Sequence, residues 1–177
     1  EPDLVPTKDG VLIARHENAL AVVKIAKDGQ IERNSAGEPI VLSATTDVAE
    51  HPEFADLLQI RQIDGRAIAG WFSEDFTLAQ IKTLHARERI PKLRPNNQRY
   101  TRLQIPTLEE ILKLVELPQN SAVGIYPELK HPTHFRYGQR QPDGPPIGID
   151  TAALLVSALD KHGYNDETRL YIQCFEV

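Results

Sequence analysis

Short apolar runs broken by turn residues open the chain. The stretch DLVPTKDGVLIARH, residues 3–16, contains two such runs joined by Thr-Lys-Asp-Gly. The Asp9-Gly10 pair is a strong hairpin signal, because both residues tolerate the positive φ angles of a tight turn. We predict a β-hairpin whose second strand ends at Arg15 and His16.

The apolar pattern fades over residues 18–73, where Asp, Gly, Asn and Pro are scattered around an isolated Trp71. Loops longer than ~15 residues inside a compact domain are usually functional or disordered. We predict an insertion or a long loop over this segment. A partly disordered surface segment is an equal alternative.

Helical periodicity marks three segments, DFTLAQIKTLHARE (75–88), IPTLEEILKLVEL (105–117) and TAALLVSALDKH (151–162). Each of the first two contains a capping box, in which Thr77 or Thr107 is followed three residues later by Gln or Glu. Asp150 is a favourable N-cap for the third segment, and Gly163 is suited to end it. We therefore predict three helices.

Two continuous apolar runs, AVGIYPELK (122–130) and RLYIQCFEV (169–177), predict buried strands. Helices that alternate with such strands are typical of βα units, and continuous apolar strands indicate a parallel sheet covered on both faces. The predicted fold class is α/β. The single cysteine, Cys174, lies in the second run, so we expect an inert, buried thiol.

Composition narrows the possible functions. The length of 177 residues suits one domain, and 20 basic against 25 acidic residues give a net charge of −5. This acidic balance argues against a nucleic-acid partner, which favours a basic face. The apolar runs fall far short of the ~20 residues of a transmembrane helix, and no signal-peptide pattern opens the sequence.

Carboxylates gather where two predicted strands carry polar residues at alternate positions. Glu128 and Lys130 are two residues apart, as are Glu1 and Asp3, so each pair projects from one face of a strand. Reactive groups in parallel α/β folds sit near the carboxyl ends of strands. Three carboxylates that converge there would need a cation, and oxygen ligands suit Mg²⁺ or Ca²⁺.

Two further residues extend this chemistry. Lys130 adds a positive charge that suits an anion beside the metal, and His16 can exchange protons near neutral pH. Together the groups describe metal-assisted phosphodiester cleavage. The plainer alternatives are a solvated Glu128–Lys130 ion pair, terminal surface charges at Glu1 and Asp3, and a structural His16.

His131 and His134 follow Lys130 closely, but two histidines without further ligands are a weak zinc signal. We interpret both as loop residues near the site.

The motifs ExDLVxTKDG, FTLAQIKTL, IPTLEEIL, GIYPELKHP and LYIQCFE, taken in order, resemble the glycerophosphodiester phosphodiesterases, most of all the bacterial periplasmic type. The resemblance implies a TIM-type (β/α)₈ barrel, a divalent metal and a pair of acid/base histidines. It assigns Glu1, Asp3 and Glu128 to the metal, His16 to catalysis and Lys130 to the phosphate.

The chain departs from this family pattern in two places. The family's His-Arg-Gly motif, with its second catalytic histidine, would precede residue 1, and Glu17 stands where an aspartate is usual. A complete barrel needs ~250 residues, so we expect residues 1–177 to be a partial barrel of a longer protein. We expect this fragment alone to be inactive, with residues 18–73 inserted above the barrel mouth.

The activity that the resemblance implies is hydrolysis of glycerophosphodiesters, small-molecule substrates, to sn-glycerol 3-phosphate and an alcohol. Its implied location is periplasmic or secreted. Two alternatives stay open. Paired carboxylates on barrel strands also describe glycosidases, and a non-catalytic surface protein of the same fold could bind ligands without turnover.

Overall fold

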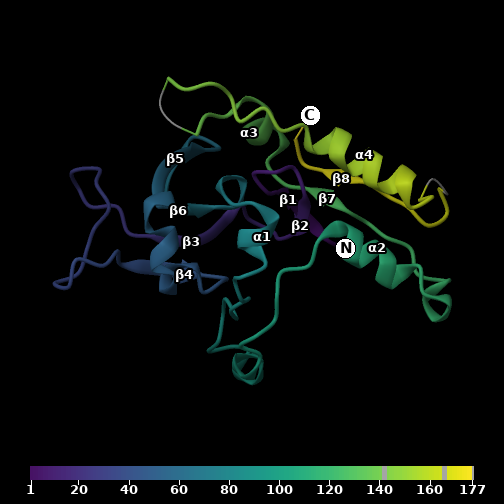
Figure 1. The fold of residues 1–177 in the computed structure, drawn as a ribbon, viewed down its shortest axis with the longest axis horizontal. Helices are drawn as coiled ribbons and strands as arrows, with labels where there is room; N and C mark the ends of the chain where they lie inside the picture. The colour runs from purple at the N-terminus through teal and green to yellow at the C-terminus, as the bar shows by residue number, and fades with distance from the viewer. Residues whose placement is uncertain (141–142, 165–166, 177) are drawn as a thin grey trace. The chain divides into compact units, whose positions relative to one another are not determined.

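The computed structural model describes residues 1–140, 143–164 and 167–176 (Figure 1). The chain forms two compact units. Unit 1 contains residues 1–18 and 106–177, and unit 2 contains residues 19–105.

Unit 1 is built on a four-stranded mixed sheet in the order β2-β1-β7-β8. The strands are β1 (Asp3–Pro6), β2 (Leu12–Ala14), β7 (Glu128–Leu129) and β8 (Gln173–Cys174). Strands β1 and β2 pair antiparallel, whereas β7 pairs parallel with both β1 and β8. The predicted parallel arrangement is therefore present in part, and a closed barrel is not formed by the described residues.

The predicted N-terminal hairpin is confirmed. Val5 pairs with Ile13 across β1 and β2, and both side chains are fully buried. The turn closes through a hydrogen bond from the Gly10 amide to the Thr7 carbonyl, 3.0 Å long. Gly10 has a φ of 76°, a conformation that glycine adopts without steric cost.

The helices of unit 1 are α2 (Leu108–Val115), α3 (Pro132–Tyr137) and α4 (Thr151–Lys161), with a 3₁₀ turn η5 (Pro118–Asn120). The predicted caps of α2 and α4 are confirmed, since Thr107 and Glu110 form the capping box and the Asp150 carboxylate accepts the Ala153 amide at 3.0 Å. Apolar residues of α2 and α4 pack with those of the sheet in one core: Leu4, Leu12, Leu108, Leu112, Val115, Ile125, Leu129, Leu155, Leu159 and Tyr164.

The prediction of two fully buried strands was wrong in extent. Strands β7 and β8 have two residues each, and Phe175 is 82% exposed. Cys174 is exposed as well, which contradicts the expected buried thiol. The reason is the position of β8 at the edge of the sheet, where the described residues cover neither of its faces fully. Val177, the last residue of this predicted strand, lies outside the described residues.

Unit 2 contains a second four-stranded sheet, antiparallel and in the order β4-β3-β6-β5. Its strands are β3 (Ala19–Val23), β4 (Val41–Ala44), β5 (Gln59–Ile63) and β6 (Arg66–Phe72). Its helical turns are η1 (Val48–Glu50), η2 (Pro52–Leu57), η3 (Ser73–Asp75), α1 (Leu78–Ile81) and η4 (Pro95–Arg99). The segment 18–73, predicted as an insertion or a long loop, thus contains the four strands of this sheet.

Close backbone packing holds β3 and β6 together. A Cβ atom added at Gly70 would lie 2.2 Å from the Ala21 carbonyl oxygen, so only glycine fits there. On β5 of the same sheet, the buried Arg61 guanidinium donates to the Glu74 and Asp75 carboxylates, each at 2.7 Å. The buried charges are therefore paired, as their removal from water requires.

The helix predicted over residues 75–88 is present only as the single turn α1. The capping box of Thr77 and Gln80 forms as predicted. Beyond Ile81 the backbone has other partners, because the His85 amide donates to the Asp47 carboxylate at 2.7 Å and Ala86 forms an antiparallel bridge with Thr46. These contacts replace the hydrogen bonds that would continue the helix.

No helix among the described residues is long and apolar enough to span a bilayer.

Candidate functional site

Asp3 and Glu128 lie side by side in unit 1. They are register partners in the parallel pairing of β1 with β7, which places the two carboxylates on adjacent strands. The ladder on either side is regular, since the Glu128 amide donates to the Pro2 carbonyl at 3.0 Å and the Lys130 amide donates to the Leu4 carbonyl at 3.1 Å. Strand pairing therefore brings together two of the three predicted metal ligands.

Lys130 joins the two carboxylates. Its ammonium lies 3.2 Å from Asp3 Oδ1 and donates a hydrogen bond to Glu128 Oε1. Burial lowers the pKa of Lys130, but the hydrogen bonds to Glu128 and Asp3 outweigh it and raise the pKa above its ordinary value. The Glu128 and Lys130 side chains are 4% and 11% exposed, so they are not the solvated edge pair of the plainer interpretation.

The donor set fits a hard divalent cation. Two carboxylates facing one ammonium leave an excess negative charge, and carboxylate oxygens are the ligands that Ca²⁺ and Mg²⁺ prefer. Glu1, the third predicted ligand, is two residues before Asp3 in the sequence and is exposed. Within the described part of the chain, Glu1 has no hydrogen bond or ion pair of its own.

His16 follows the hairpin and is held by its neighbour Glu17. The His16 Nδ1 atom lies 2.7 Å from Glu17 Oε1, and His131 Nε2 lies 3.2 Å from Glu17 Oε2. One carboxylate thus contacts two imidazoles, from the end of β2 and from the residue after Lys130. Burial raises the pKa of Glu17, but hydrogen bonds from His16 and His131 outweigh it and hold the pKa below its usual range.

Arg15 directly precedes His16 and donates through Nε to the Glu17 carbonyl at 3.2 Å. Burial lowers the pKa of its guanidinium to about 10, partly opposed by the Glu17 charge. Arg15 therefore keeps its positive charge at neutral pH next to the histidine and carboxylate.

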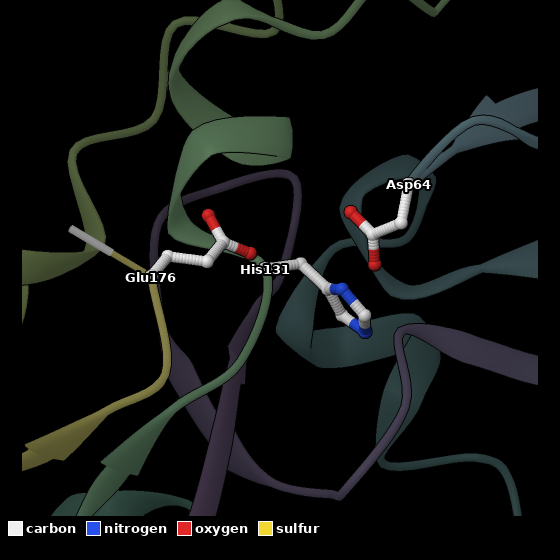
Figure 2. A group of neighbouring side chains, drawn as sticks. All are labelled: Asp64, His131 and Glu176. Atoms are coloured by element: carbon white, nitrogen blue, oxygen red, sulfur yellow. The ribbon is translucent and has the colours of Figure 1, made fainter.

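His131 and Glu176 extend this group within unit 1 (Figure 2). Their possible ligand atoms lie within 4.8 Å of each other. Glu176 also accepts a hydrogen bond from the Thr133 amide at 2.9 Å, at the start of α3. Figure 2 also labels Asp64, which belongs to unit 2. His134 is buried beside Phe135, with ring centroids 5.3 Å apart, so it is a packed helix residue and not a loop residue.

Sequence reasoning gave Glu17 and His131 no role. Glu17 appeared only as a longer replacement for aspartate, and His131 only as a residue near the site. The adjacency of His16 and Glu17 could have suggested a histidine–carboxylate pair. The contact between Glu17 and His131 spans 114 positions of the chain, so no local pattern predicts it.

The mixed sheet thus places one carboxylate at the first residue of β1 and one at the first residue of β7, with Lys130 directly after β7. The chain belongs to the glycerophosphoryl diester phosphodiesterase family, whose model matches residues 1–177. It is 33% identical over 165 residues to glycerophosphodiester phosphodiesterase GDPD6 of Arabidopsis thaliana. This match covers 93% of this chain and 36% of that protein.

Solved structures agree on the fold. A glycerophosphodiester phosphodiesterase from Agrobacterium tumefaciens matches with a TM-score of 0.50 and 15% identity, over 99% of this chain and 44% of that one. A provisionally assigned phosphodiesterase of the same type from Silicibacter pomeroyi matches with a TM-score of 0.54 and 17% identity, over 99% of this chain and 47% of that one.

The chain therefore spans less than half the length of these relatives. Membership of the family implies a TIM-barrel type of fold, of which the described residues show a mixed sheet with helices.

Proposed function

We propose that the protein carrying this chain hydrolyses glycerophosphodiesters to sn-glycerol 3-phosphate and an alcohol such as choline, ethanolamine or glycerol. The observation that carries the proposal is the buried group of Asp3, Glu128 and Lys130, in a chain of this family. Two carboxylates with one lysine suit a cation and a phosphate together, whereas a neutral sugar needs no fixed positive charge.

Glu1, Asp3 and Glu128 would hold a divalent cation, Ca²⁺ or Mg²⁺. Such an ion, when bound, supplies charge stabilisation to a phosphoryl oxygen. Lys130 then exchanges its carboxylate contacts for a phosphate oxygen of the substrate, since its ammonium already lies beside both carboxylates.

His16 moves a proton in this proposal. The attacking oxygen forms a bond to phosphorus, the bond from phosphorus to the alcohol oxygen breaks, and a proton passes from the attacking group to the leaving alkoxide. Glu17 accepts from His16 Nδ1 and so leaves His16 Nε2 as the nitrogen that faces the reaction.

The direct test uses the intact protein and glycerophosphocholine. Release of glycerol 3-phosphate is measured with a coupled dehydrogenase assay. Glu128→Gln should lower kcat/KM by roughly a hundredfold or more, because it removes a carboxylate charge that would hold the cation, and with it the stabilisation of the transition state. Glu109→Gln, on the exposed face of α2, is the matched control and should leave the rate unchanged.

Metal removal provides a second test. Dialysis of the intact protein against EDTA should abolish turnover, and Ca²⁺ or Mg²⁺ should restore it. Activity that survives EDTA would contradict the metal role. Intact protein that binds glycerophosphocholine without turnover would support the non-catalytic alternative, and turnover by residues 1–177 alone would contradict the predicted inactivity of this fragment.

A further inference from the structure

A pocket of about 200 Å³ lies in unit 1, away from the carboxylate group. It is lined by the C-terminal ends of α2 and α4 and by the segments that precede β7 and β8, through Glu116, His162, Tyr164 and Arg169. Glu128 begins β7 and Lys130 follows it, and neither residue lines the pocket. A single water needs only ~10–15 Å³ of such space, so the pocket has room for a small molecule.

Three polar atoms in this pocket are buried and have no hydrogen-bond partner among the described residues. They are His162 Nε2, the Tyr164 hydroxyl and Arg169 Nε. The His162 side chain is 9% exposed and Tyr164 is 7% exposed. Leaving one such group unpaired costs about 1–3 kcal/mol, so three together favour a bound polar ligand.

Arg169 brings a positive charge that no carboxylate of the described residues pairs. Its Nη2 donates to the Val123 carbonyl at 2.8 Å, and its guanidinium lies 5.5 Å from the centre of the Tyr164 ring. The Arg169 carbonyl accepts the Ile125 amide at 2.8 Å, which fixes the backbone of this arginine. The side chain is thus pre-positioned, with Nε left for a ligand.

His162 is oriented by a second contact. Its Nδ1 lies 2.6 Å from Glu116 Oε1, so Nδ1 carries the proton of that bond and Nε2 remains for a ligand. In the neutral imidazole Nε2 accepts a hydrogen bond, and in the imidazolium it donates one. The ligand must therefore offer an acceptor to Arg169, and either kind of group to Tyr164 and His162.

A phosphate group meets these requirements. Its unprotonated oxygens accept from Arg169 and Tyr164, and its P–OH group or a further oxygen pairs with His162. A carboxylate offers no donor and so satisfies His162 only as the imidazolium, and a metal ion is repelled by the guanidinium. The partial negative charge at the ends of the two helices opposes an anion, but Lys113 and Lys161 in their last turns offset it.

We propose that this pocket is a second phosphate-binding site, distinct from the site formed by Asp3, Glu128 and Lys130. The phosphate group comes from inorganic phosphate or from a phosphomonoester. The proposal does not rest on the proposed hydrolysis, because binding is measured here without turnover.

The test is equilibrium dialysis of the intact protein against radiolabelled inorganic phosphate, with glycerol phosphate in a parallel arm. All proteins in this experiment carry Lys130→Gln as a background substitution, so that phosphate bound by Lys130 does not contribute. In this background we expect one saturable site, which Tyr164→Phe weakens roughly tenfold through loss of one hydrogen bond. Tyr164→Phe keeps the ring against Arg169, so folding should be preserved.

Arg169→Gln should abolish the site, and Tyr137→Phe, at an exposed tyrosine, should leave it intact. If unlabelled glycerol phosphate displaces the labelled phosphate as well as unlabelled inorganic phosphate does, the site accepts phosphomonoesters. If only inorganic phosphate displaces the label, the site is specific for free phosphate. Binding that is absent, or that is equal in the background protein and in its Tyr164→Phe and Arg169→Gln variants, would overturn the proposal and leave only water in the pocket.

Discussion

Asp47 is a buried carboxylate that holds two segments of unit 2 together. It accepts the His85 amide at 2.7 Å and His85 Nδ1 at 2.9 Å, with Arg87 at 3.4 Å. Burial raises the pKa of Asp47, but these hydrogen bonds and the Arg87 charge outweigh it, so the pKa lies below its ordinary value. The ionised form is thus favoured in the folded state.

We predict that Asp47→Asn lowers the free energy of unfolding of unit 2 by about 1–3 kcal/mol at pH 7, because an amide nitrogen cannot accept from His85. The wild-type contribution is present above the unfolded pKa of ~3.9 and is lost as pH falls through the lower folded pKa. The difference between the two proteins should therefore shrink in acid. Trp71, the single tryptophan, is buried in unit 2 and reports the urea transition by fluorescence.

Asp56→Asn, at an exposed aspartate of the same unit, is the control and should leave the transition unchanged. An equal stability difference between wild type and Asp47→Asn at pH 7 and at pH 2 would contradict the role of the ionised carboxylate.

Glu17 is the second residue whose contacts lead to a prediction. Because its carboxylate orients His16, we expect Glu17→Gln to lower kcat by roughly tenfold or more with little change in KM. Glu17→Asp should retain most of the rate. A raised KM with an unchanged kcat, measured on glycerophosphocholine, would mean that Glu17 acts in binding instead.

At the scale of elements, the capping box of α2 is a local feature with a measurable contribution. Thr107 Oγ1 accepts the Glu110 amide at 3.1 Å, and the Glu110 carboxylate accepts the Thr107 amide at 2.8 Å. We predict that Thr107→Ala lowers the free energy of unfolding of unit 1 by ~1 kcal/mol. Thr107→Ser keeps the hydroxyl and should lose much less in the same circular-dichroism denaturation experiment.

The contact of β6 with β3 gives a larger effect. Gly70→Ala would force a methyl group to within 2.2 Å of the Ala21 carbonyl oxygen, so the strands must separate. We predict that Gly70→Ala lowers the free energy of unfolding of unit 2 by ~1–3 kcal/mol or more, measured by Trp71 fluorescence. Gln62→Ala, an exposed position on the neighbouring strand β5, should stay within ~0.5 kcal/mol of wild type. Similar stability of the two variants would show that the sheet relaxes around the methyl group.

At the scale of the whole molecule, unit 2 interrupts unit 1 between Asn18 and Pro106. The chain returns to unit 1 beside β2, because the Ala14 amide donates to the Pro106 carbonyl at 2.8 Å and Ile13 bridges to Thr107. The points at which the chain leaves unit 1 and re-enters it are therefore close together, as at sites that tolerate inserted domains.

We predict that replacement of residues 19–105 by a short Gly-Ser linker in the intact protein leaves unit 1 folded. Cooperative thermal unfolding and protected amides at Ile125 and Leu129 would support this, because both residues belong to the core of unit 1. An aggregated or non-cooperative product would show that unit 1 requires unit 2. Full-length protein prepared in parallel is the reference.

The sequence by itself determined the elements whose signals are local. The hairpin at Asp9-Gly10 and the caps at Thr107 and Asp150 follow from contacts within four residues, which any chain with these residues can form. The same kind of signal was present but missed in unit 2. Asp64 and Gly65 have φ angles of 49° and 75°, and they join β5 to β6 in a two-residue hairpin that the Asp-Gly pair could have predicted.

Tertiary structure decided what depends on distant partners. The helix predicted over residues 75–88 stops after one turn because Asp47 and Thr46 take the backbone groups that would continue it. Glu128 and Lys130 show the same division: their spacing placed them on one face, but the pairing of β7 with β1 supplied Asp3. Hydrogen bonds and charges act over a few ångströms, so only folding brings such residues within range.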